Sequence, residues 1–377
     1  MGFINKRGPG QYRARYRAPG GQERSRTFER RADAERFLAS VEADKARGVW
    51  VDPRLGRTLY RDWADRWLKT TVHLKPKTQA GYESLLRSHV LPTFGQSPLH
   101  AIRLLEVREW IAAMRARGLS ASRVRQARQV LFATLQLAVE SGIVASNAAT
   151  GAKVPREPTR EMRYLTVEQL ERLAAATRAP YDILIYVLGY GGLRWGEAVA
   201  LRRARVDLLG SNLHVRESLA EVGGNLHWGA TKTHRGRVVA IPRFLRSLLE
   251  QHLASAVRPE EDALVFQGPS GGPLLHSNFS RHLWRPAVVA AGLPSDLRMH
   301  ELRHTTATLL IDAGAHPKAI QQQLGHSSIT VTLDTYGHLF PSHLGELAER
   351  LEKSRSAILQ RTAASARPTD VTAPRPA

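Results

Sequence analysis

Alternating apolar and polar positions predict that residues 2–30 form a small β-sheet. Within residues 11–17, one face carries Tyr12, Ala14 and Tyr16, and the opposite face carries Arg13, Arg15 and Arg17. Residues 18–21 (APGG) predict a turn, and residues 23–28 then alternate again as a second strand. Residues 32–47 follow a helical period, which predicts a helix with one apolar stripe.

A helical period dominates residues 57–150 and predicts an all-α domain of four helices. These helices are expected from Leu59, over residues 78–90, from Leu104 and over residues 120–140. The second helix is expected to begin after Pro76 and to end before Pro92. The apolar stripes are more typical of a core than of a ligand site. Linkers are predicted at residues 48–57 and 147–158, where proline and glycine interrupt the pattern.

The pattern becomes mixed after residue 164. Thr166 followed by Gln169 is the signature of a capping box at the start of a helix. Residues 181–190 are apolar and are expected to be buried. Further helices are expected at residues 243–256, 300–313 and 343–359, and strands at residues 212–215, 225–228 and 237–241. Residues 329–332 are rich in β-branched side chains and predict another strand. Residues 362–377, rich in Ala, Pro and Thr, are expected to be disordered.

Together these patterns predict a multi-domain protein, and 377 residues are enough for two or three domains. Residues 1–50 are expected to form a small β-sheet plus helix, and residues 57–150 an all-α domain. A mixed, mainly α-helical (α+β) domain is expected over residues 160–350. The end of a C-terminal helix and a disordered tail would follow at residues 351–377.

The composition narrows the class of protein. The chain has no Cys, which excludes disulfides, thiol chemistry and Cys-based zinc fingers. It has no apolar run of the roughly 18–20 residues that a membrane span requires. Its first residues lack the apolar core of a signal peptide, so we expect a cytoplasmic protein with no membrane partner.

The net charge of +21 is unevenly distributed. Residues 57–156 carry 16 Lys and Arg against 6 Asp and Glu, whereas the last 221 residues carry 26 against 21. A basic N-terminal half suits a polyanion, because each neutralised phosphate releases condensed counterions. A generally basic composition or a solubility device is the alternative interpretation of the charge alone.

Two groups of arginines are candidate DNA contacts. The first is the arginine face of residues 11–17, since a two-stranded ribbon fits the major groove. A solvated face of a small sheet explains this pattern equally well. The second group lies near the start of the fourth predicted helix and consists of Arg123, Arg125 and Arg128.

Residues 300–304 (HELRH) carry candidate chemistry. On a helix, His300, Arg303 and His304 project to one side, and Arg offers planar bidentate contacts to phosphate. The same residues match the zinc-protease pattern H-E-x-x-H. Such a site needs a third protein ligand, and neither a suitable His nor a Glu follows before Glu346. A phosphate site is therefore the favoured interpretation over a metalloprotease.

Neither a metal nor ATP is expected. A two-metal nuclease needs several clustered carboxylates, whereas Glu197, Glu301 and Asp334 are isolated along the chain. The chain also lacks a G-x-x-x-x-G-K-[ST] phosphate-binding loop. The sequence thus favours a mechanism without cofactors, in which cationic side chains stabilise the charge.

Over nearly its full length the chain resembles the tyrosine recombinases, specifically the phage-type integrases. The resemblance rests on five short motifs in family order: GGLRWGE (residues 191–197), TKT (231–233), HELRH (300–304), LGH (324–326) and DTYGH (334–338). It implies six catalytic residues: Arg194, Lys232, His300, Arg303, His326 and Tyr336.

The roles implied by the resemblance are chemically coherent. Arg194 and Arg303 would bind the non-bridging phosphate oxygens, and His326 would add a hydrogen bond. Lys232 would protonate the leaving 5′-oxygen, and His300 would act as acid or base. Tyr336 would attack and leave a 3′-phosphotyrosine. Glu197 is expected to orient Arg194, and His304 is interpreted as structural.

The resemblance also implies how the domains are used. Residues 1–50 would be an arm-type DNA-binding domain and residues 57–150 a helical core-binding domain. Residues 343–360 would be a helix that docks on a neighbouring protomer in a homotetramer on double-stranded DNA. DNA-bending or directionality proteins are further expected partners, at the nucleoid.

Integration and excision of a mobile element through a Holliday junction is the favoured function. A chromosome-dimer resolvase of the same superfamily and a non-catalytic DNA-binding regulator are the alternatives. Two conflicts remain. At residues 329–332 the β-branched side chains favour a strand, whereas the resemblance implies a helix. In addition, ten residues separate His326 from Tyr336, and a straight helix would hold them apart. Either the chain bends back between them or the tyrosine segment is mobile, and we favour mobility as a hypothesis.

Overall fold

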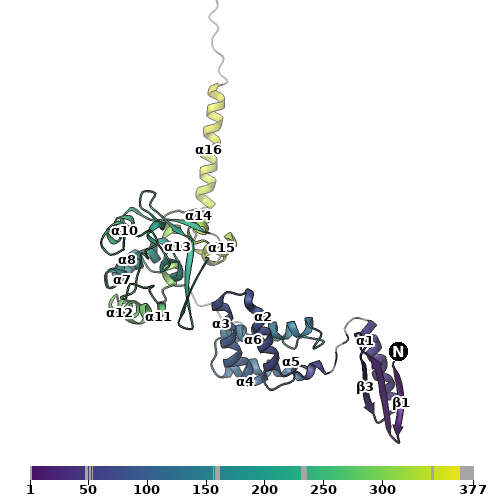
Figure 1. The fold of residues 1–377 in the computed structure, drawn as a ribbon. Helices are drawn as coiled ribbons and strands as arrows, with labels where there is room; N and C mark the ends of the chain where they lie inside the picture. The colour runs from purple at the N-terminus through teal and green to yellow at the C-terminus, as the bar shows by residue number, and fades with distance from the viewer. Residues whose placement is uncertain are drawn as a thin grey trace, which may run out of the picture. The chain divides into compact units, whose positions relative to one another are not determined.

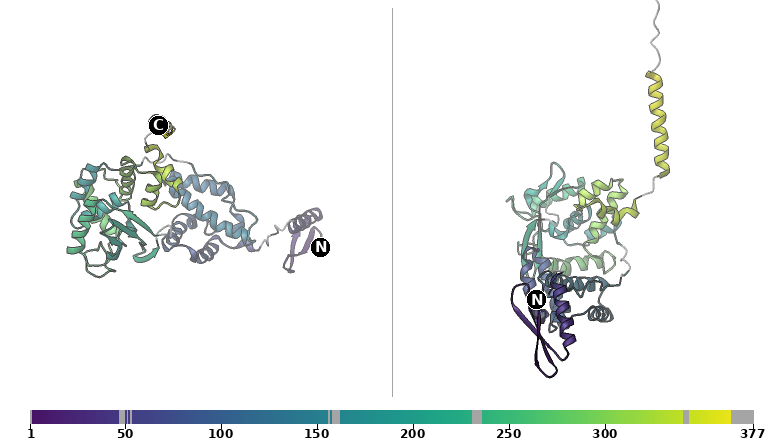
Figure 2. Two further views of the ribbon diagram at one scale, coloured as in Figure 1. Left: turned by 90° about the horizontal axis from the view of Figure 1, so that it is seen from above. Right: turned by 90° about the vertical axis from the view of Figure 1, so that its right-hand side faces the viewer.

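The computed structural model describes residues 2–46, 50, 52, 54–155, 157, 162–230, 236–340 and 344–365. The chain divides into two compact units. One comprises Met1–Arg160 with Glu221–His227, and the other Glu161–Ala220 with Trp228–Ala377. Figure 1 labels the elements, and Figure 2 shows them from two further directions. Among the helices of the described ranges, none is long and apolar enough to cross a membrane.

An antiparallel sheet and one helix form the N-terminal part. The strands β1 (Phe3–Gly8), β2 (Gln11–Arg17) and β3 (Glu23–Phe28) pair in that order, and α1 (Arg31–Ala46) lies along one face (Figures 1 and 2). Ala14 and Tyr16 are buried, and the Tyr16 and Phe37 ring centroids are 5.7 Å apart. The predicted two-faced pattern of β2 is therefore confirmed. The sheet has a third strand, β1, in addition to the two strands that the alternating pattern predicts.

The all-α region follows the predicted helices closely, except at one proline. Its helices are α2 (Tyr60–Thr70), α3 (Pro76–Leu85), α4 (Leu91–Phe94), α5 (Leu104–Ala116) and α6 (Ala121–Glu140). The expected helix end before Pro92 is wrong. A π-helical turn at Leu86–Val90 joins α3 to α4, and Pro92 lies in the first turn of α4. A proline there removes no required N–H donor, so the helix continues past it.

The second unit is mixed, as expected, with helices around short antiparallel strands. Its first part contains α7 (Val167–Ala175), α8 (Tyr181–Gly191), α9 (Trp195–Ala198) and α10 (Arg243–Ser255). Its strands are β4 (Val206–Asp207), β5 (Asn212–Val215) and β8 (Arg237–Ala240), with parts of β6 (Glu217–Val222) and β7 (Asn225–Ala230), whose residues 221–227 belong to the first unit. They form a sheet of order β4-β5-β8 and a hairpin of β6 and β7.

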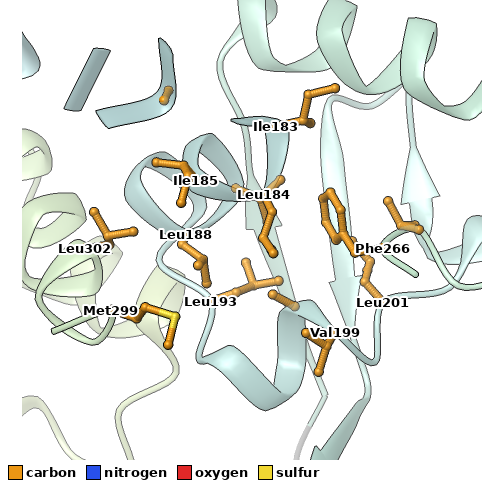
Figure 3. Close-up of a cluster of buried hydrophobic side chains, with 14 of the residues drawn as sticks. Ile183, Leu184, Ile185, Leu188, Leu193, Val199, Leu201, Phe266, Met299 and Leu302 are labelled. Atoms are coloured by element: carbon orange, nitrogen blue, oxygen red, sulfur yellow. The ribbon is translucent and has the colours of Figure 1, made fainter. Parts of the chain in front are cut away.

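The later helices of the second unit carry most of the HELRH, LGH and DTYGH motifs. They are α11 (His276–Phe279), a π turn (Ser280–Trp284), α12 (Arg285–Ala290), α13 (Glu301–Asp312), α14 (Pro317–Leu324), α15 (Ile329–Tyr336) and α16 (Leu344–Ser365). Apolar side chains of α8 and α13 meet in the core, where Leu188 and Leu302 lie close together (Figure 3). The capping box predicted at Thr166 is confirmed.

Two local predictions in the C-terminal part are wrong. Residues 329–332, expected as a strand, begin α15 because the Ser328 hydroxyl caps the helix by accepting from the Thr330 N–H at 3.1 Å. The helix buries Thr332 and Tyr336, one turn apart. Disorder was expected from residue 362, but α16 continues to Ser365 through alanines that favour helix.

A pair of glycines allows a test of the packing between α8 and α14. Gly192 ends α8 with φ of 67°, and Gly314 follows α13 with φ of 76°. A Cβ on Gly192 would lie 2.6 Å from the buried Leu324 side chain, whereas a Cβ on Gly314 would meet nothing within 4 Å.

We therefore expect Gly192→Ala to destabilise the protein more than Gly314→Ala. Both variants place alanine in the left-handed region, at a cost of about 1–2 kcal/mol. Only Gly192→Ala adds overpacking, worth about 1–3 kcal/mol more. Urea denaturation of the two variants measures the difference, and equal losses would contradict the packing described here.

Candidate active site

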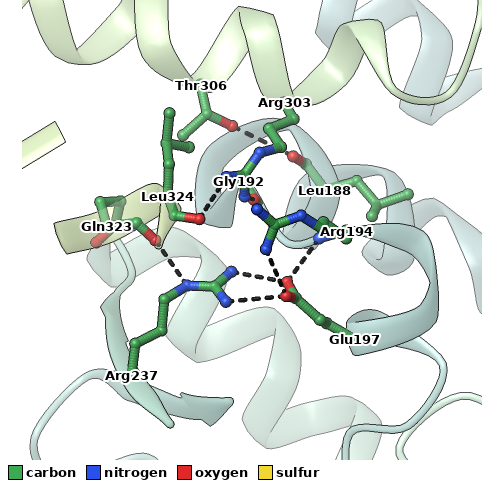
Figure 4. Close-up of polar contacts among 9 residues, drawn as sticks. All are labelled: Leu188, Gly192, Arg194, Glu197, Arg237, Arg303, Thr306, Gln323 and Leu324. Atoms are coloured by element: carbon green, nitrogen blue, oxygen red, sulfur yellow. Dashed lines mark hydrogen bonds and ion pairs between the residues drawn. The ribbon is translucent and has the colours of Figure 1, made fainter. Parts of the chain in front are cut away.

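Three segments that lie far apart in the sequence converge in the second unit: the start of α9, the first turns of α13 and the α14–α15 region. Figure 4 shows their polar contacts. Three guanidinium groups, those of Arg194, Arg237 and Arg303, gather around the single carboxylate of Glu197. The cluster therefore carries a net positive charge suited to an anion.

Arg194 is held at the start of α9 by its neighbour one turn later. The Arg194 backbone N–H donates to Glu197 Oε2 at 2.9 Å, and its guanidinium donates to Glu197 Oε1 at 2.8 Å. About a quarter of the Arg194 side chain is exposed. Glu197 thus orients an arginine that still has N–H groups available to a ligand, as the sequence interpretation expected.

Glu197 is a buried carboxylate bound from two sides. Arg237, on β8, donates to both of its oxygens at 3.0 and 2.8 Å (Figure 4). Burial alone would raise the pKa of Glu197, but the hydrogen bonds and charge of Arg237, together with Arg194, lower it to about 2. The carboxylate is therefore ionised at neutral pH and holds two arginines in place.

Arg237 also fixes the end of α14. Its Nε donates to the Gln323 carbonyl at 3.0 Å. The Gln323 side-chain amide in turn bonds the Ala240 N–H at 3.0 Å and the Ala240 carbonyl at 2.8 Å. β8 consequently joins the Arg194 segment to the segment that carries His326.

Arg303, predicted as a second phosphate ligand, is 3% exposed. It donates to the carbonyls of Gly192 and Leu324, which lie at the C-terminal ends of α8 and α14 (Figure 4). A cation is favoured at such helix ends. Burial, with the charges of Arg194 and Arg237, lowers the pKa of Arg303 to about 9, so it remains charged at neutral pH. Arg303 therefore anchors two helices, with further N–H groups left over for a ligand.

His326 and Tyr336 are brought together by a bend, which resolves the geometric conflict noted in the sequence. Gly325 ends α14 with φ of 67°, and α15 begins only at Ile329. The His326 and Tyr336 rings stack with centroids 6.3 Å apart and planes 9° apart. His326 Nδ1 bonds Thr332 Oγ1 at 2.8 Å, which leaves Nε2 for another partner.

Tyr336 is almost completely buried, with 1% of its surface exposed. Its hydroxyl lies 2.8 Å from His304 Nδ1. Burial raises the pKa of Tyr336 to about 12, although the charge of Arg303 acts in the opposite direction. In this state the tyrosine is a neutral, hydrogen-bonded phenol.

His300 precedes the first residue of α13, and its ring centroid lies 5.3 Å from that of His304. It borders a cavity of about 420 Å³ that Trp195, Arg285 and Arg298 also line. Lys232 lies outside the described residues, so its predicted role stays a prediction.

The predicted DNA contacts of the first unit differ in their surroundings. Arg13 donates to Ser25 at 2.9 Å, Arg15 pairs with Glu23 at 3.2 Å, and Arg17 is exposed. All three lie on the face of β2 opposite to the one that α1 covers. On α6, Arg125 is exposed, and its guanidinium donates to the Pro155 carbonyl at 3.5 Å.

The other two α6 arginines are less exposed, and both make contacts within the protein. Arg123 Nε donates to His89 Nε2 at 3.2 Å. Arg128 donates to the Ala149 carbonyl at 2.7 Å, and its guanidinium lies 5.2 Å from the centre of the Phe132 ring. These contacts give both arginines a structural role.

The sequence interpretation gave two residues of the cluster no chemical role. Arg237 was assigned only to a strand, because its partner Glu197 lies 40 residues away. His304 was interpreted as structural, yet it contacts the Tyr336 hydroxyl. Its position one helical turn after His300 is the signal that could have indicated this.

The fold, the arginine cluster and the tyrosine define a tyrosine recombinase. The chain belongs to the phage integrase family: residues 163–343 match "Phage integrase family", residues 1–47 its N-terminal domain and residues 59–115 its N-terminal SAM-like domain. The prophage phiRv2 integrase of Mycobacterium tuberculosis is 31% identical over 365 residues, covering 94% of this chain and 95% of that protein.

Solved structures share the fold. The Tn1549 transposon integrase in complex with a circular intermediate DNA has a TM-score of 0.67 at 22% identity, covering 79% of this chain and 99% of that one. A lambda integrase tetramer bound to a Holliday junction has a TM-score of 0.58 at 20% identity, covering 87% and 96%.

The Arg237–Glu197 ion pair predicts a large loss of stability in Arg237→Gln. Removing Arg237 takes away two of the hydrogen bonds to the buried Glu197 carboxylate and leaves Arg194 as its remaining ion-pair partner. Breaking a buried ion pair costs up to about 3–5 kcal/mol. The matched control is Arg163→Gln, which breaks an exposed ion pair with Asp296 and should cost about 1 kcal/mol or less. Chemical denaturation compares them. Equal, small losses would show that the buried pair does not hold the site together.

Proposed function

We propose that this integrase cuts and rejoins DNA through Tyr336, and so integrates or excises a mobile element by site-specific recombination. The observation that carries the proposal is the gathering of Arg303, His304 and His326 around one buried tyrosine, with Arg194 beside Arg303 and His300 beside His304. A structural tyrosine would not require so many cationic or proton-transferring groups.

The reaction follows from the chemistry of these groups. The Tyr336 oxygen attacks phosphorus while Arg194 and the remaining N–H groups of Arg303 bind the non-bridging oxygens. The Nε2–H of His326 donates a hydrogen bond to the phosphate. In this tautomer the Nδ1 atom accepts a hydrogen bond from the Thr332 hydroxyl. Lys232 or His300 protonates the departing 5′-oxygen. The phosphotyrosyl ester retains the bond energy, so rejoining needs no ATP.

The described state requires a rearrangement before attack. Tyr336 is buried against His326 and His304, so a phosphodiester cannot reach its oxygen until the site opens. Binding of DNA or of further protomers would supply that opening. The bend between α14 and α15, and not mobility, explains how His326 and Tyr336 meet. Mobility of the tyrosine segment stays a hypothesis for the approach of DNA.

The partners are double-stranded attachment-site DNA and three further copies of the chain. The lambda integrase tetramer on a Holliday junction supports this assembly by analogy of fold. Leu351, Ile358 and Leu359 of α16 are each more than half exposed, which suits a helix that docks on a neighbouring protomer. Residues 1–50 would bind arm sites, residues 57–150 the core site, and accessory DNA-bending proteins would assist. The enzyme would work in the cytoplasm, at the nucleoid.

The integrase function is better supported than a chromosome-dimer resolvase. Residues 1–47 match the N-terminal domain of phage integrases, and such a module is not expected in the resolvases. A non-catalytic regulator would need the basic surface but not the residues around Tyr336.

A nicked suicide substrate tests the proposal. It is built from the DNA junctions that flank the gene, so that cleavage releases a short fragment and traps the covalent intermediate. We expect the wild type and Tyr164→Phe, a surface control, to form an adduct on a denaturing gel. Tyr336→Phe should form none, and EDTA should not reduce the yield. Adduct formation by Tyr336→Phe would refute the assignment of the nucleophile.

The arginine face of β2 predicts a change in the salt dependence of arm-DNA binding. Each lost phosphate contact lowers the slope of log K against log salt by about 0.9. Arg13→Gln/Arg17→Gln should therefore lower the slope by about 2. The control Arg31→Gln/Arg36→Gln changes two exposed arginines of α1 and should leave the slope unchanged. Equal slopes in all three proteins would refute DNA binding by this face.

A further inference from the structure

His304 is in hydrogen-bond contact with the atom that would react. It lies on α13, one turn after His300, and its Nδ1 is 2.8 Å from the Tyr336 hydroxyl oxygen. The two ring centroids are 5.8 Å apart, with the planes at 62°. Among the contacts of the described residues, His304 is the one hydrogen-bond partner of this hydroxyl. The roles inferred from the sequence leave His304 without a chemical function.

We propose that His304 is a catalytic residue that accepts the phenolic proton of Tyr336 during attack on DNA. The proposal rests on the function proposed above and adds the missing proton acceptor. In the cleavage step, the O–H proton passes to His304 Nδ1 while the Tyr336 oxygen bonds phosphorus and the bond to the 5′-oxygen breaks. Lys232 or His300 donates a proton to that oxygen. Rejoining reverses each transfer, so protons balance.

The direction of the hydrogen bond follows from burial. A buried O–H group without an acceptor costs about 1–3 kcal/mol. The Tyr336 hydroxyl is protonated, so the favoured arrangement has it donating to an unprotonated Nδ1, with the His304 proton on Nε2. Burial first, and then the nearby His300 and Arg303, lower the pKa of His304 to about 4. The ring is therefore neutral at pH 7 and can accept.

The two other histidines are less well placed for this step. The His326 ring lies nearly parallel to the Tyr336 ring with centroids 6.3 Å apart, and its Nδ1 bonds Thr332. The hydrogen bond of the Tyr336 hydroxyl goes to His304 instead. His300 contacts the site through the edge of His304, at 5.3 Å between centroids. His304 is thus the histidine aligned with the nucleophile.

The transfer is unfavourable without DNA, which suits a controlled nucleophile. Tyr336 holds its proton far more strongly than His304 does, given pKa values of about 12 and about 4. As the oxygen bonds phosphorus, it loses its basicity and the proton becomes easy to transfer. The new imidazolium then lies beside the phosphate negative charge, which offsets the repulsion from His300 and Arg303. Proton transfer therefore accompanies attack and does not precede it.

The experiment compares His304→Gln and His304→Asn with the wild type in single-turnover adduct formation. Two suicide substrates are used: ordinary DNA and DNA with a 5′-bridging sulfur, whose thiolate leaves without a proton. Loss of a general base should slow both substrates about 10²- to 10⁴-fold. The sulfur substrate should rescue Lys232→Ala, which lacks a general acid, but not the His304 variants.

The pH profile supplies a readout that a structural role would not change. The groups facing His304 are His300 just before α13, Arg303 from α13, His326 from the turn after α14, and Tyr336 from α15. A base must be unprotonated, so the wild-type rate should fall only as pH drops through the His304 pKa, and be level above it. In His304→Gln, hydroxide must replace the base, so the rate should rise about tenfold per pH unit between pH 7 and 9.

His316→Asn is the matched control. His316 is exposed and caps α14 by accepting from the Lys318 N–H at 3.1 Å, and Asn is a good N-cap. It should retain wild-type rates, and the His304 variants must retain junction-DNA binding and denaturation midpoints. Rescue of His304→Gln by the sulfur substrate, or an unchanged pH profile, would overturn the proposal. If Tyr336→Phe forms adducts, the proposed function itself fails, whatever His304 does.

Discussion

The site is organised by one buried carboxylate. Glu197 accepts hydrogen bonds from Arg194 on its own short helix and from Arg237 on β8. Without it, the guanidinium groups of Arg194, Arg237 and Arg303 would repel one another in a region largely shielded from water. One negative charge among three positive charges permits the cluster to exist and still leaves an excess for a phosphate.

Arg303 both stabilises the fold and is placed to bind a phosphate. Its guanidinium binds the last carbonyls of α8 and α14, whose helix ends carry partial negative charge. The same contacts fix the guanidinium in position and leave N–H groups directed elsewhere. A ligand phosphate would thus meet an arginine that is already ordered, so little conformational entropy is lost on binding.

Local signals were predictable from the sequence, and contacts between distant segments were not. The capping box at Thr166 and the two faces of β2 depend on residues a few positions apart. Arg237 acquires its meaning only when β8 lies beside Glu197 and Gln323, which are 40 and 86 residues away. The strand predicted at residues 329–332 was wrong because the Ser328 cap and the burial of Tyr336 favour a helix more strongly than β-branched side chains favour a strand. The motifs therefore indicated the chemistry, while the supporting ion pairs had to come from the fold.

The buried tyrosine and the arginine cluster complement each other in the absence of DNA. Cations alone would favour a phenolate, because Arg303 lowers the pKa of Tyr336, but burial outweighs that effect and keeps the phenol neutral. Burial likewise keeps His304 and His326 uncharged, with pKa values of about 4. Tyr336 is thus held in its unreactive protonated form, next to a neutral His304 that can accept its proton. An incoming phosphate supplies the negative charge that the cluster lacks. That charge favours transfer of the Tyr336 proton, because it stabilises the imidazolium that forms.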